Sequence, residues 1–442
     1  MVKELLDRIE KLRALELNQE IIEKIISLYD TVCDVTLHNE LDVSPILDYI
    51  TFLCDDLGRF EDAFEAFESI DKCLRQTGRE VSAREKSELF YLNGKINIGI
   101  KSYNHAIVVL DDAKELADEL YRAEGASIAA LCRCIRNATA CALELSGRYK
   151  EAFEYYKRAK GYAEIAYEYD SRANRCYLAM IYDNYSSSLD MLGGEDNTVL
   201  KYHSRSIEIY RELVIENKKY KVNLANCYYS MARYFSKRKD YDKAERYFLE
   251  SIRMREEIRK KNPTAVDCKL SGTYYALGLM YMRSGRGISK ELCAMNSAKE
   301  IRISLRKQSA IYANELADVF QYLIYDIGPE VDINQRNELR AEYVDALLQS
   351  NSLSEKENQN LCEEGYLTAY YMSDVGRYDK ALSVLCGVID TFISVGSNRW
   401  LLSLSQDEID LLSKLCSELN RPEIYDEYSK KILNLYSNGS KR

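Results

Sequence analysis

Proline and glycine are scarce in this chain, which has 442 residues but only 4 Pro and 19 Gly. These two residues disfavour a helix interior more than any others, so little interrupts helix formation. Long apolar runs are missing too, and no stretch approaches the roughly 20 apolar residues of a membrane-spanning helix. The start, residues 1–11, is charged and amphipathic, unlike the apolar centre of a signal peptide. We therefore expect a helical, cytoplasmic protein.

Histidine and net positive charge are also in short supply. The three histidines, His38, His105 and His203, lie in different parts of the chain, and none belongs to a pattern such as H-E-x-x-H. The net charge is −10, whereas binding to a nucleic acid backbone needs a basic surface. The basic runs at 216–221 and 258–263 fall where helices should end, and there Lys and Arg suit the helix dipole. We predict no catalytic residues, no nucleic acid and no membrane partner.

Cysteine is plentiful, with 13 residues. Because no signal peptide precedes them, we expect free thiols in a reducing compartment. The segment "CRCIRNATAC" brings Cys132, Cys134 and Cys141 together in sequence, as some zinc sites do. Residues two apart on a helix do not face each other, however, so one ion could not reach both Cys132 and Cys134 on an intact helix. Structural cysteines are the favoured interpretation, and we predict no metal and no cofactor.

A short segment is repeated along the chain: "GRFEDA" at 58, "GRYKEA" at 147, "KDYDKA" at 239 and "GRYDKA" at 376, with a weaker copy, "KSYNHA", at 101. The alanines that close these segments are Ala63, Ala106, Ala152, Ala244 and Ala381. Their spacings (106 − 63 = 43, 152 − 106 = 46, 244 − 152 = 92, 381 − 244 = 137) are close to whole multiples of one unit. A fixed period of this length indicates a solenoid of stacked units.

Each unit has the pattern of two helices joined by a turn. In the clearest unit the apolar residues before the turn have helical spacing, and so do those after it: Leu224, Tyr228, Met231, Ala232 and Phe235, then Ala244, Tyr247, Phe248, Ser251, Ile252 and Ile258. Pro263 should end the second helix. We expect the aromatic residue and the alanine of each turn to hold the two helices together. One such hairpin leaves an apolar face open and needs its neighbours to cover it.

These units resemble the tetratricopeptide repeat (TPR). The residues that match its first helix are Tyr274, Leu277, Gly278, Tyr281 and Gly285, and those that match its second are Tyr149, Ala152, Tyr156 and Ala159. The period is longer than the about 34 residues usual in the family. It is similar to an extended class found in kinesin-light-chain-like proteins and in bacterial arrays associated with signalling. The resemblance implies an all-α, right-handed α-solenoid of TPR-like hairpins with helical caps at both ends.

The repeat frame divides the chain into three parts. Residues 1–43 are predicted to be an N-terminal helical cap, 44–400 an array of about eight units with a weaker one near 312–350, and 401–442 capping helices with a disordered tail. The first helices of the units are expected near 44–57, 87–100, 133–146, 179–192, 225–238, 271–284, 312–325 and 362–375.

The resemblance also implies which residues line the concave surface, because the family displays fixed positions of each first helix there. The candidate partner-binding residues are Asn137, Asn184, Asn226, Tyr229, Arg233, Lys237, Tyr275, Arg283, Asn314 and Gln321; Glu144, Asp183, Ser187, Tyr366 and Tyr370 occupy similar positions. Asn can donate to and accept from a peptide backbone, Arg can bind a carboxylate through two hydrogen bonds, and Tyr adds rigid contact area. A peptide or protein with an acidic or carboxylate feature fits this composition.

Two classes of function follow. The favoured one is a non-enzymatic scaffold that binds a protein or peptide in the concave groove, and that could be the sensor or adaptor subunit of a bacterial system whose enzyme is a separate chain. The alternative is a peptide-responsive regulator of a signalling protein, similar to quorum-sensing TPR regulators. That alternative requires residues 1–40 to be a working domain rather than a cap.

Overall fold

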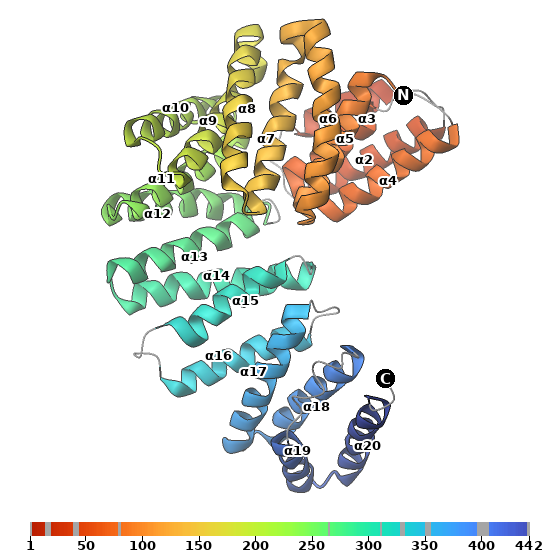
Figure 1. Ribbon diagram of the computed structural model, residues 1–442, viewed down its shortest axis with the longest axis vertical. Helices are drawn as coiled ribbons and strands as arrows, with labels where there is room; N and C mark the ends of the chain where they lie inside the picture. The colour runs from red at the N-terminus through yellow and green to blue at the C-terminus, as the bar shows by residue number, and fades with distance from the viewer. Residues whose placement is uncertain are drawn as a thin grey trace. The chain divides into compact units, whose positions relative to one another are not determined.

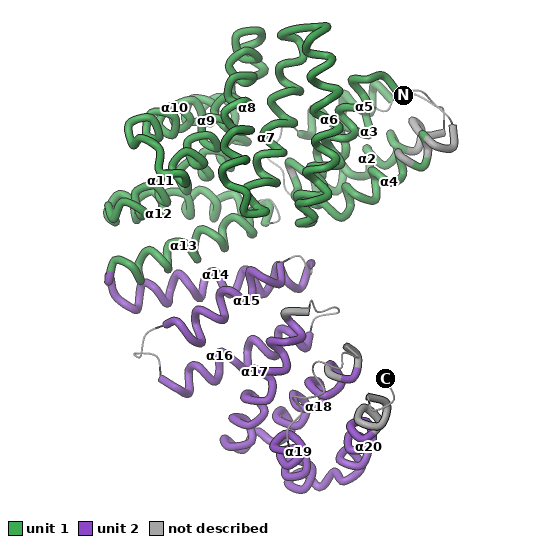
Figure 2. Tube along the Cα trace, in the orientation of Figure 1, with its two compact units in different colours: residues 1–284 green, residues 285–442 purple. Residues whose placement is uncertain are grey.

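The structure, a computed structural model, describes residues 2–13, 19–38, 44–77, 81–263, 266–309, 312–327, 332–349, 355–395 and 406–439. Within these ranges the regular structure is helical and contains no strand (Figure 1), which confirms the all-α prediction. The chain forms two compact units, Met1–Ser284 (unit 1) and Gly285–Arg442 (unit 2) (Figure 2). No helix of the described part is both long enough and apolar enough to span a membrane.

Unit 1 is a succession of helices in which each packs against the next along the chain. Its α-helices are α1 (Val2–Arg13), α2 (Gln19–His38), α3 (Ser44–Phe52), α4 (Phe60–Thr77), α5 (Ala83–Gly99), α6 (Tyr103–Glu124), α7 (Ala129–Leu145), α8 (Tyr149–Tyr169), α9 (Ser171–Met191), α10 (Asp196–Glu216), α11 (Lys221–Lys237), α12 (Tyr241–Arg259) and α13 (Asp267–Ser284). Three short helical segments join them: η1 (Leu53–Leu57), η2 (Gly125–Ile128) and η3 (Lys218–Tyr220).

Unit 2 continues the helical pattern with less regular lengths. Its helices are α14 (Ile288–Gln308), α15 (Ala313–Gln321), α16 (Ile333–Leu348), α17 (Glu355–Asp374), α18 (Tyr378–Val395), α19 (Gln406–Glu418) and α20 (Pro422–Gly439), with a π-helical turn, η5 (Tyr322–Asp326), after α15. The helix α20 extends through Gly439, so residues 437–439 are helical although the sequence analysis assigns them to a disordered tail. The end caps proposed for residues 1–43 and 401–442 stay a prediction.

Helix ends match the repeat frame better than helix starts do. The predicted first helices correspond to α3 with η1, then α5, α7, α9, α11, α13, α15 with η5, and α17. However, α5 begins at Ala83 rather than near 87, and α9 begins at Ser171 rather than near 179. The repeated segment marks the turn after each first helix, so it locates the C-terminus of that helix. Nothing in the repeat marks where the helix begins.

A left-handed residue ends the first helix of most hairpins, although α15 with η5 ends at Ile327, which is extended with φ −67°. Gly147 has φ 83°, and its N–H bonds to the carbonyl of Glu144 at 3.0 Å while the next N–H, of Arg148, bonds to Leu143 at 2.8 Å. This pair of bonds is a Schellman motif, which uses carbonyls that the helix end leaves free. Lys239 occupies the equivalent position in its unit with φ 62°, a conformation that only glycine adopts without steric cost. The six-residue repeat is therefore a helix stop followed by the start of the next helix.

The alanine that closes each repeat is buried, as predicted. Ala63, Ala106, Ala152, Ala244 and Ala381 have no exposed surface. A larger side chain at these positions would separate the two helices, because protein interiors are packed without spare volume. The aromatic residue of the turn is half-buried in four of these units, at Phe60, Tyr103, Tyr241 and Tyr378. Tyr149 differs because it is 45% exposed, and in its unit the buried Ala152 and Tyr156 make the contact between the helices.

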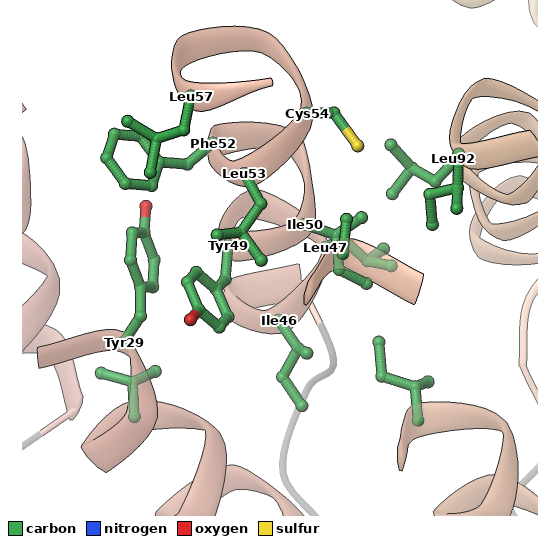
Figure 3. Packing of buried hydrophobic residues seen from close by; sticks show 14 of the residues in the cluster. Tyr29, Ile46, Leu47, Tyr49, Ile50, Phe52, Leu53, Cys54, Leu57 and Leu92 are labelled. Carbon is green, nitrogen blue, oxygen red and sulfur yellow. The ribbon is translucent and has the colours of Figure 1, made fainter. Parts of the chain in front are cut away.

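Aromatic residues organise the core at the start of unit 1 (Figure 3). Tyr29 of α2 stacks on Tyr49 of α3 with ring centroids 4.8 Å apart and lies 5.8 Å from Phe52. Ile9 of α1 and Ile25 and Tyr29 of α2 are buried in this cluster. The first two helices are therefore packed onto the following hairpin through their apolar faces.

Candidate functional site

The predicted binding residues lie on first helices of both units. Asn137 is on α7, Asn184 on α9, Asn226, Tyr229, Arg233 and Lys237 on α11, Tyr275 and Arg283 on α13, and Asn314 and Gln321 on α15. The first eight belong to unit 1 and the last two, both exposed, to unit 2. Contacts connect several of the residues in unit 1.

Two of the predicted asparagines meet across neighbouring hairpins. The Asn184 amide nitrogen donates to the Asn137 side-chain oxygen at 2.8 Å, and both residues are half-buried. Lys237 instead lies against the previous repeat, where its ammonium group is 3.6 Å from the Asp190 carboxylate and also bonds the Asp190 carbonyl. Lys237 is therefore partly neutralised, and the positive charge predicted for the groove must come chiefly from other residues.

Tyr229 is the centre of a second cluster. The guanidinium of Arg233 lies 5.8 Å from its ring centroid, and that of Arg255, on α12, lies 5.5 Å away. Arg255 also donates to the Asn226 side-chain oxygen at 2.8 Å. The predicted residues Asn226, Tyr229 and Arg233 thus come together, but around an arginine that the repeat frame does not include.

Arg255 is a buried cation with neutral neighbours. It is 2% exposed, and its remaining hydrogen bonds go to the carbonyl of Lys269 at 2.7 Å and to the hydroxyl of Thr273. Among the described residues, its Nε atom has no hydrogen-bond partner and no carboxylate contacts the guanidinium group. Burial lowers the pKa of Arg255 to about 10, because desolvation disfavours the charged form. A buried charge without a counter-ion is costly, so this residue is a candidate for function.

Arg133 on α7 repeats this arrangement. It is also 2% exposed, donates to the Asn174 side-chain oxygen at 3.1 Å, and lies 4.1 Å from the ring centroid of Tyr177 on α9. Its Nε atom has no hydrogen-bond partner either. Tyr177 is 44% exposed, yet desolvation by the surrounding protein raises its pKa to about 12. Tyr177 is therefore partly open to solvent where its ring lies against Arg133.

Residues far apart in the chain come near one another around Lys269. Lys269, in the first turn of α13, lies close enough for the carboxylate of Asp55 in η1 and the thiol of Cys141 in α7 to act on its pKa. The lysine in turn acts on the pKa of Cys141, and Figure 1 shows the start of α13 near the end of α7. We call the surface that carries Asp55, Cys141, Asn184, Tyr229 and Lys269 the inner face of unit 1.

Asp183 is not available on the inner face, contrary to its predicted position. It is buried, its carboxylate is 2.8 Å from Nδ1 of His203, and it accepts a hydrogen bond of 2.8 Å from Ser230. Because the aspartate lies between the histidine and the serine, the histidine cannot take the serine proton, and the order differs from that of a catalytic triad. His203 is 1% exposed and packs in the core.

The three neighbouring cysteines go to three different places. Cys132 is buried with its sulfur 3.6 Å from the carbonyl of Ala117, Cys141 is 3.3 Å from the Tyr156 hydroxyl, and Cys134 contacts Arg133 at 3.1 Å. Their environments agree with the structural role that helix geometry predicts. The cysteines that the structure describes are free thiols.

No protein-family model matches the chain, and no curated protein matches it by sequence. Solved structures do match. A Rap protein complexed with competence and sporulation factor is 15% identical, with 88% of this chain and 98% of that chain covered and a TM-score of 0.50. NprR in complex with its cognate peptide NprX is 17% identical, with 88% and 99% covered and a TM-score of 0.46. The apo form of the quorum sensor NprR from B. thuringiensis is 13% identical, with 98% and 97% covered and a TM-score of 0.45.

The similarity to the Rap protein extends over nearly all of both chains, and it joins the helical hairpins and the repeated turn as evidence for the fold. The chain has a TPR-type repeat fold. This confirms the resemblance inferred from the repeated residues.

Within the TPR-type fold, sequence reasoning missed Arg133, Tyr177, Arg255 and Lys269. Tyr177 and Lys269 precede the predicted starts of their helices, at 179 and 271, and so lie outside the positions that the frame places on the concave surface. Arg255 is on the second helix of its hairpin, which the frame treats as outer, but its long side chain reaches between α11 and α13. A signal was present, because Arg255 interrupts the apolar stripe between Ile252 and Ile258.

Proposed function

We propose that this protein is a non-enzymatic, cytoplasmic peptide-binding protein that holds an extended segment of a peptide or partner protein on the inner face of unit 1. The observation that carries the proposal is the composition of that face. It combines side-chain amides with tyrosines stacked on buried arginines that no carboxylate neutralises.

The amides suit a peptide backbone. The hydrogen bond between Asn184 and Asn137 uses one N–H and one oxygen, which leaves the oxygen of Asn184 and the amide nitrogen of Asn137 for a ligand. The Asn184 oxygen can then accept from a peptide N–H, and the Asn137 amide can donate to a peptide C=O. Backbone recognition of this kind is tolerant of the peptide sequence, so selectivity must come from neighbouring residues.

The comparison with solved structures supports a binding role. The Rap protein of similar fold is complexed with competence and sporulation factor, so a helical array of this type can hold another molecule. The free thiols support a reducing compartment such as the cytoplasm. Asn314 and Gln321 of unit 2 remain proposed as further contact residues.

The test is selection from a library of short synthetic peptides on the immobilised full chain, followed by calorimetry of the enriched peptides. Replacing both asparagines (Asn137→Ala with Asn184→Ala) should weaken binding about thirtyfold, because two hydrogen bonds of about 1 kcal/mol each are lost. The matched control is Asn197→Ala, an exposed asparagine of α10.

The control variant should bind like the wild type, and circular dichroism should show that all variants are folded. The proposed function is wrong if the wild-type chain enriches no peptide. If peptides bind equally well to the double variant, the inner face is not the binding surface.

A further inference from the structure

Positive charge gathers at one end of the inner face of unit 1. Lys269 is the third residue of α13, where the free N–H groups make the positive end of the helix dipole. A cation is disfavoured at this end of a helix. The other residue of that turn with a full charge, Asp267, is directed to Arg259 at 2.8 Å and does not neutralise the lysine.

Arg255 adds a second positive charge beside Lys269. Its guanidinium donates to the backbone carbonyl of Lys269 at 2.7 Å, so it lies directly beneath the first turn of α13. Burial and then the charge of Arg255 lower the pKa of the Lys269 amine. The Lys269 side chain is nevertheless exposed to solvent, and no ion pair involving it is formed among the described residues.

The negative charge that acts on Lys269 belongs to Asp55, which is already in an ion pair. The carboxylate of Asp55, which acts on Lys269 across the inner face, forms an ion pair with Lys95 of α5. Lys95 in turn lies 5.8 Å from the ring of Tyr91 on the same helix. The region around Lys269 therefore keeps a net positive charge, although the whole chain carries −10.

Neutral groups complete the cluster. Arg255 has five N–H donors and makes three hydrogen bonds, so its charge is only solvated by the carbonyl of Lys269 and by the side chains of Thr273 and Asn226. Tyr229 is half-buried, its ring lies 5.5 Å from the guanidinium, and its hydroxyl makes no hydrogen bond to the described residues. Arg255 thus lies between two residues with a donor group, Lys269 with its amine and Tyr229 with its hydroxyl.

A structural role does not account for this arrangement. Apolar residues usually replace a buried charge without loss of stability, and a lysine at the start of α13 adds electrostatic cost. An anion bound at the surface would remove both costs at once. The two donor groups match the two oxygens of a carboxylate, whereas a phosphate group offers three oxygens and more charge.

We propose that Lys269, Arg255, Asn226 and Tyr229 form an anion subsite at the junction of α11, α12 and α13, and that it takes a carboxylate group of the bound peptide. This inference rests on the proposed function and adds to it. Lys269 contacts the carboxylate, Arg255 supplies charge from below, and Asn226 holds Arg255 in place. The subsite explains how an acidic protein would select an acidic ligand.

The experiment uses the full chain and three sets of synthetic peptides. The first set has a free C-terminal carboxylate and no Asp or Glu, the second has Asp or Glu and an amidated C-terminus, and the third has neither. Binding of each set is measured for the wild type, for Lys269→Glu and for Lys157→Glu, an equally exposed lysine on the outer helix α8. Both variants make the same change in net charge.

The subsite predicts that the wild type prefers the first or the second set to the third, and that Lys269→Glu lowers affinity for the preferred set at least about tenfold while Lys157→Glu does not. Preference for the first set identifies a C-terminal carboxylate, and preference for the second identifies an acidic side chain. Phosphoserine peptides form a fourth set, and their tighter binding would overturn the assignment to a carboxylate.

Failure of the subsite differs from failure of the proposed function. If the wild type binds all three sets alike, or if Lys269→Glu loses no more affinity than Lys157→Glu, the anion subsite is wrong although peptide binding stands. If no set binds, the proposed function fails and the subsite fails with it. Because Lys269 is exposed, its replacement leaves the fold intact, which circular dichroism checks.

Discussion

At the scale of single residues, two buried arginines differ in whether a carboxylate balances their charge. Arg306 in unit 2 is paired with Glu357, with Nε 2.7 Å from one carboxylate oxygen and Nη2 3.2 Å from the other. Both side chains are at most 5% exposed, so the two charges satisfy each other within the core. Arg255 in unit 1 is equally buried but has only neutral partners. The paired arginine belongs to the architecture, and the unpaired one marks a place for a ligand.

Removal of one partner tests the first of these roles. Glu357→Ala removes the carboxylate that contacts Arg306 in the core, and we expect the free energy of unfolding of unit 2 to fall by about 3–5 kcal/mol. Urea unfolding monitored by circular dichroism measures the change. Lys380→Ala, which breaks an exposed ion pair with Asp345, should cost at most about 1 kcal/mol. Equal effects of the two substitutions would show that the buried pair contributes no more than a surface pair.

At the scale of elements, the hairpin turn is the unit that the chain repeats. Gly58, Gly147, Gly193, Gly285 and Gly376 all have positive φ at the ends of first helices, and Lys101 and Lys239 occupy the same position in two further hairpins. The turn requires a backbone conformation rather than a particular side chain. The alanine that follows is required by the close approach of the two helices.

Two glycine substitutions separate backbone conformation from packing. A Cβ atom at Gly147 or at Gly161 would meet nothing within 4 Å, so neither substitution causes a clash. Gly147→Ala places alanine at φ 83° and should destabilise unit 1 by about 1 kcal/mol. Gly161→Ala, in the interior of α8, should stabilise it by about 0.5–1 kcal/mol. Denaturant midpoints measure both, and a change of the same sign for the two variants would contradict the role of the left-handed turn.

At the scale of the whole molecule, tyrosine is the characteristic residue of the core, with 36 copies against 10 of Phe and 1 of Trp. Many tyrosines are buried in helix contacts, and burial raises the pKa of Tyr156 and Tyr210 well above its usual value and that of Tyr182 to about 12. A hydroxyl on an otherwise apolar ring lets one residue fill the core and also bond across helices, as Tyr210 does to the carbonyl of Cys176 at 2.8 Å. Because these hydroxyls must stay protonated in the folded protein, its stability should fall at alkaline pH.

We expect the protein to lose stability as the pH rises from about 10, the pKa of tyrosine in an unfolded chain, to about 12. A tyrosine whose pKa is raised by folding contributes stability that is complete below the unfolded pKa and is lost as the pH passes the folded value. Arg255 changes the stability in the opposite direction, since folding lowers its pKa to about 10. It is a single group, whereas many tyrosines have a raised pKa. Tyrosinate absorbance should rise together with the loss of helix signal. Titration of most tyrosines near pH 10 with the helices intact would contradict the prediction.

Much of the candidate site could be predicted from the repeat alone. The positions of Asn137, Asn184, Asn226, Tyr229 and Arg233 follow from counting along each first helix, and the structure brings them into two clusters. Lys237 was placed on the correct helix, but its ion pair with Asp190 depends on the neighbouring hairpin. The position of a residue along its own helix does not show whether a charged residue about one repeat away will neutralise it.

The sequence by itself determined the helical class, the period and the hairpin turns, because these depend on local properties: helical spacing of apolar residues, a left-handed stop and a small residue where helices touch. Only the tertiary structure decided where each helix begins and which charges remain without a partner. Lys269 and Asp55 come near each other because successive hairpins curve within unit 1, and Arg255 joins them by reaching between two first helices. Those contacts join residues from different hairpins, so no local pattern in the sequence records them.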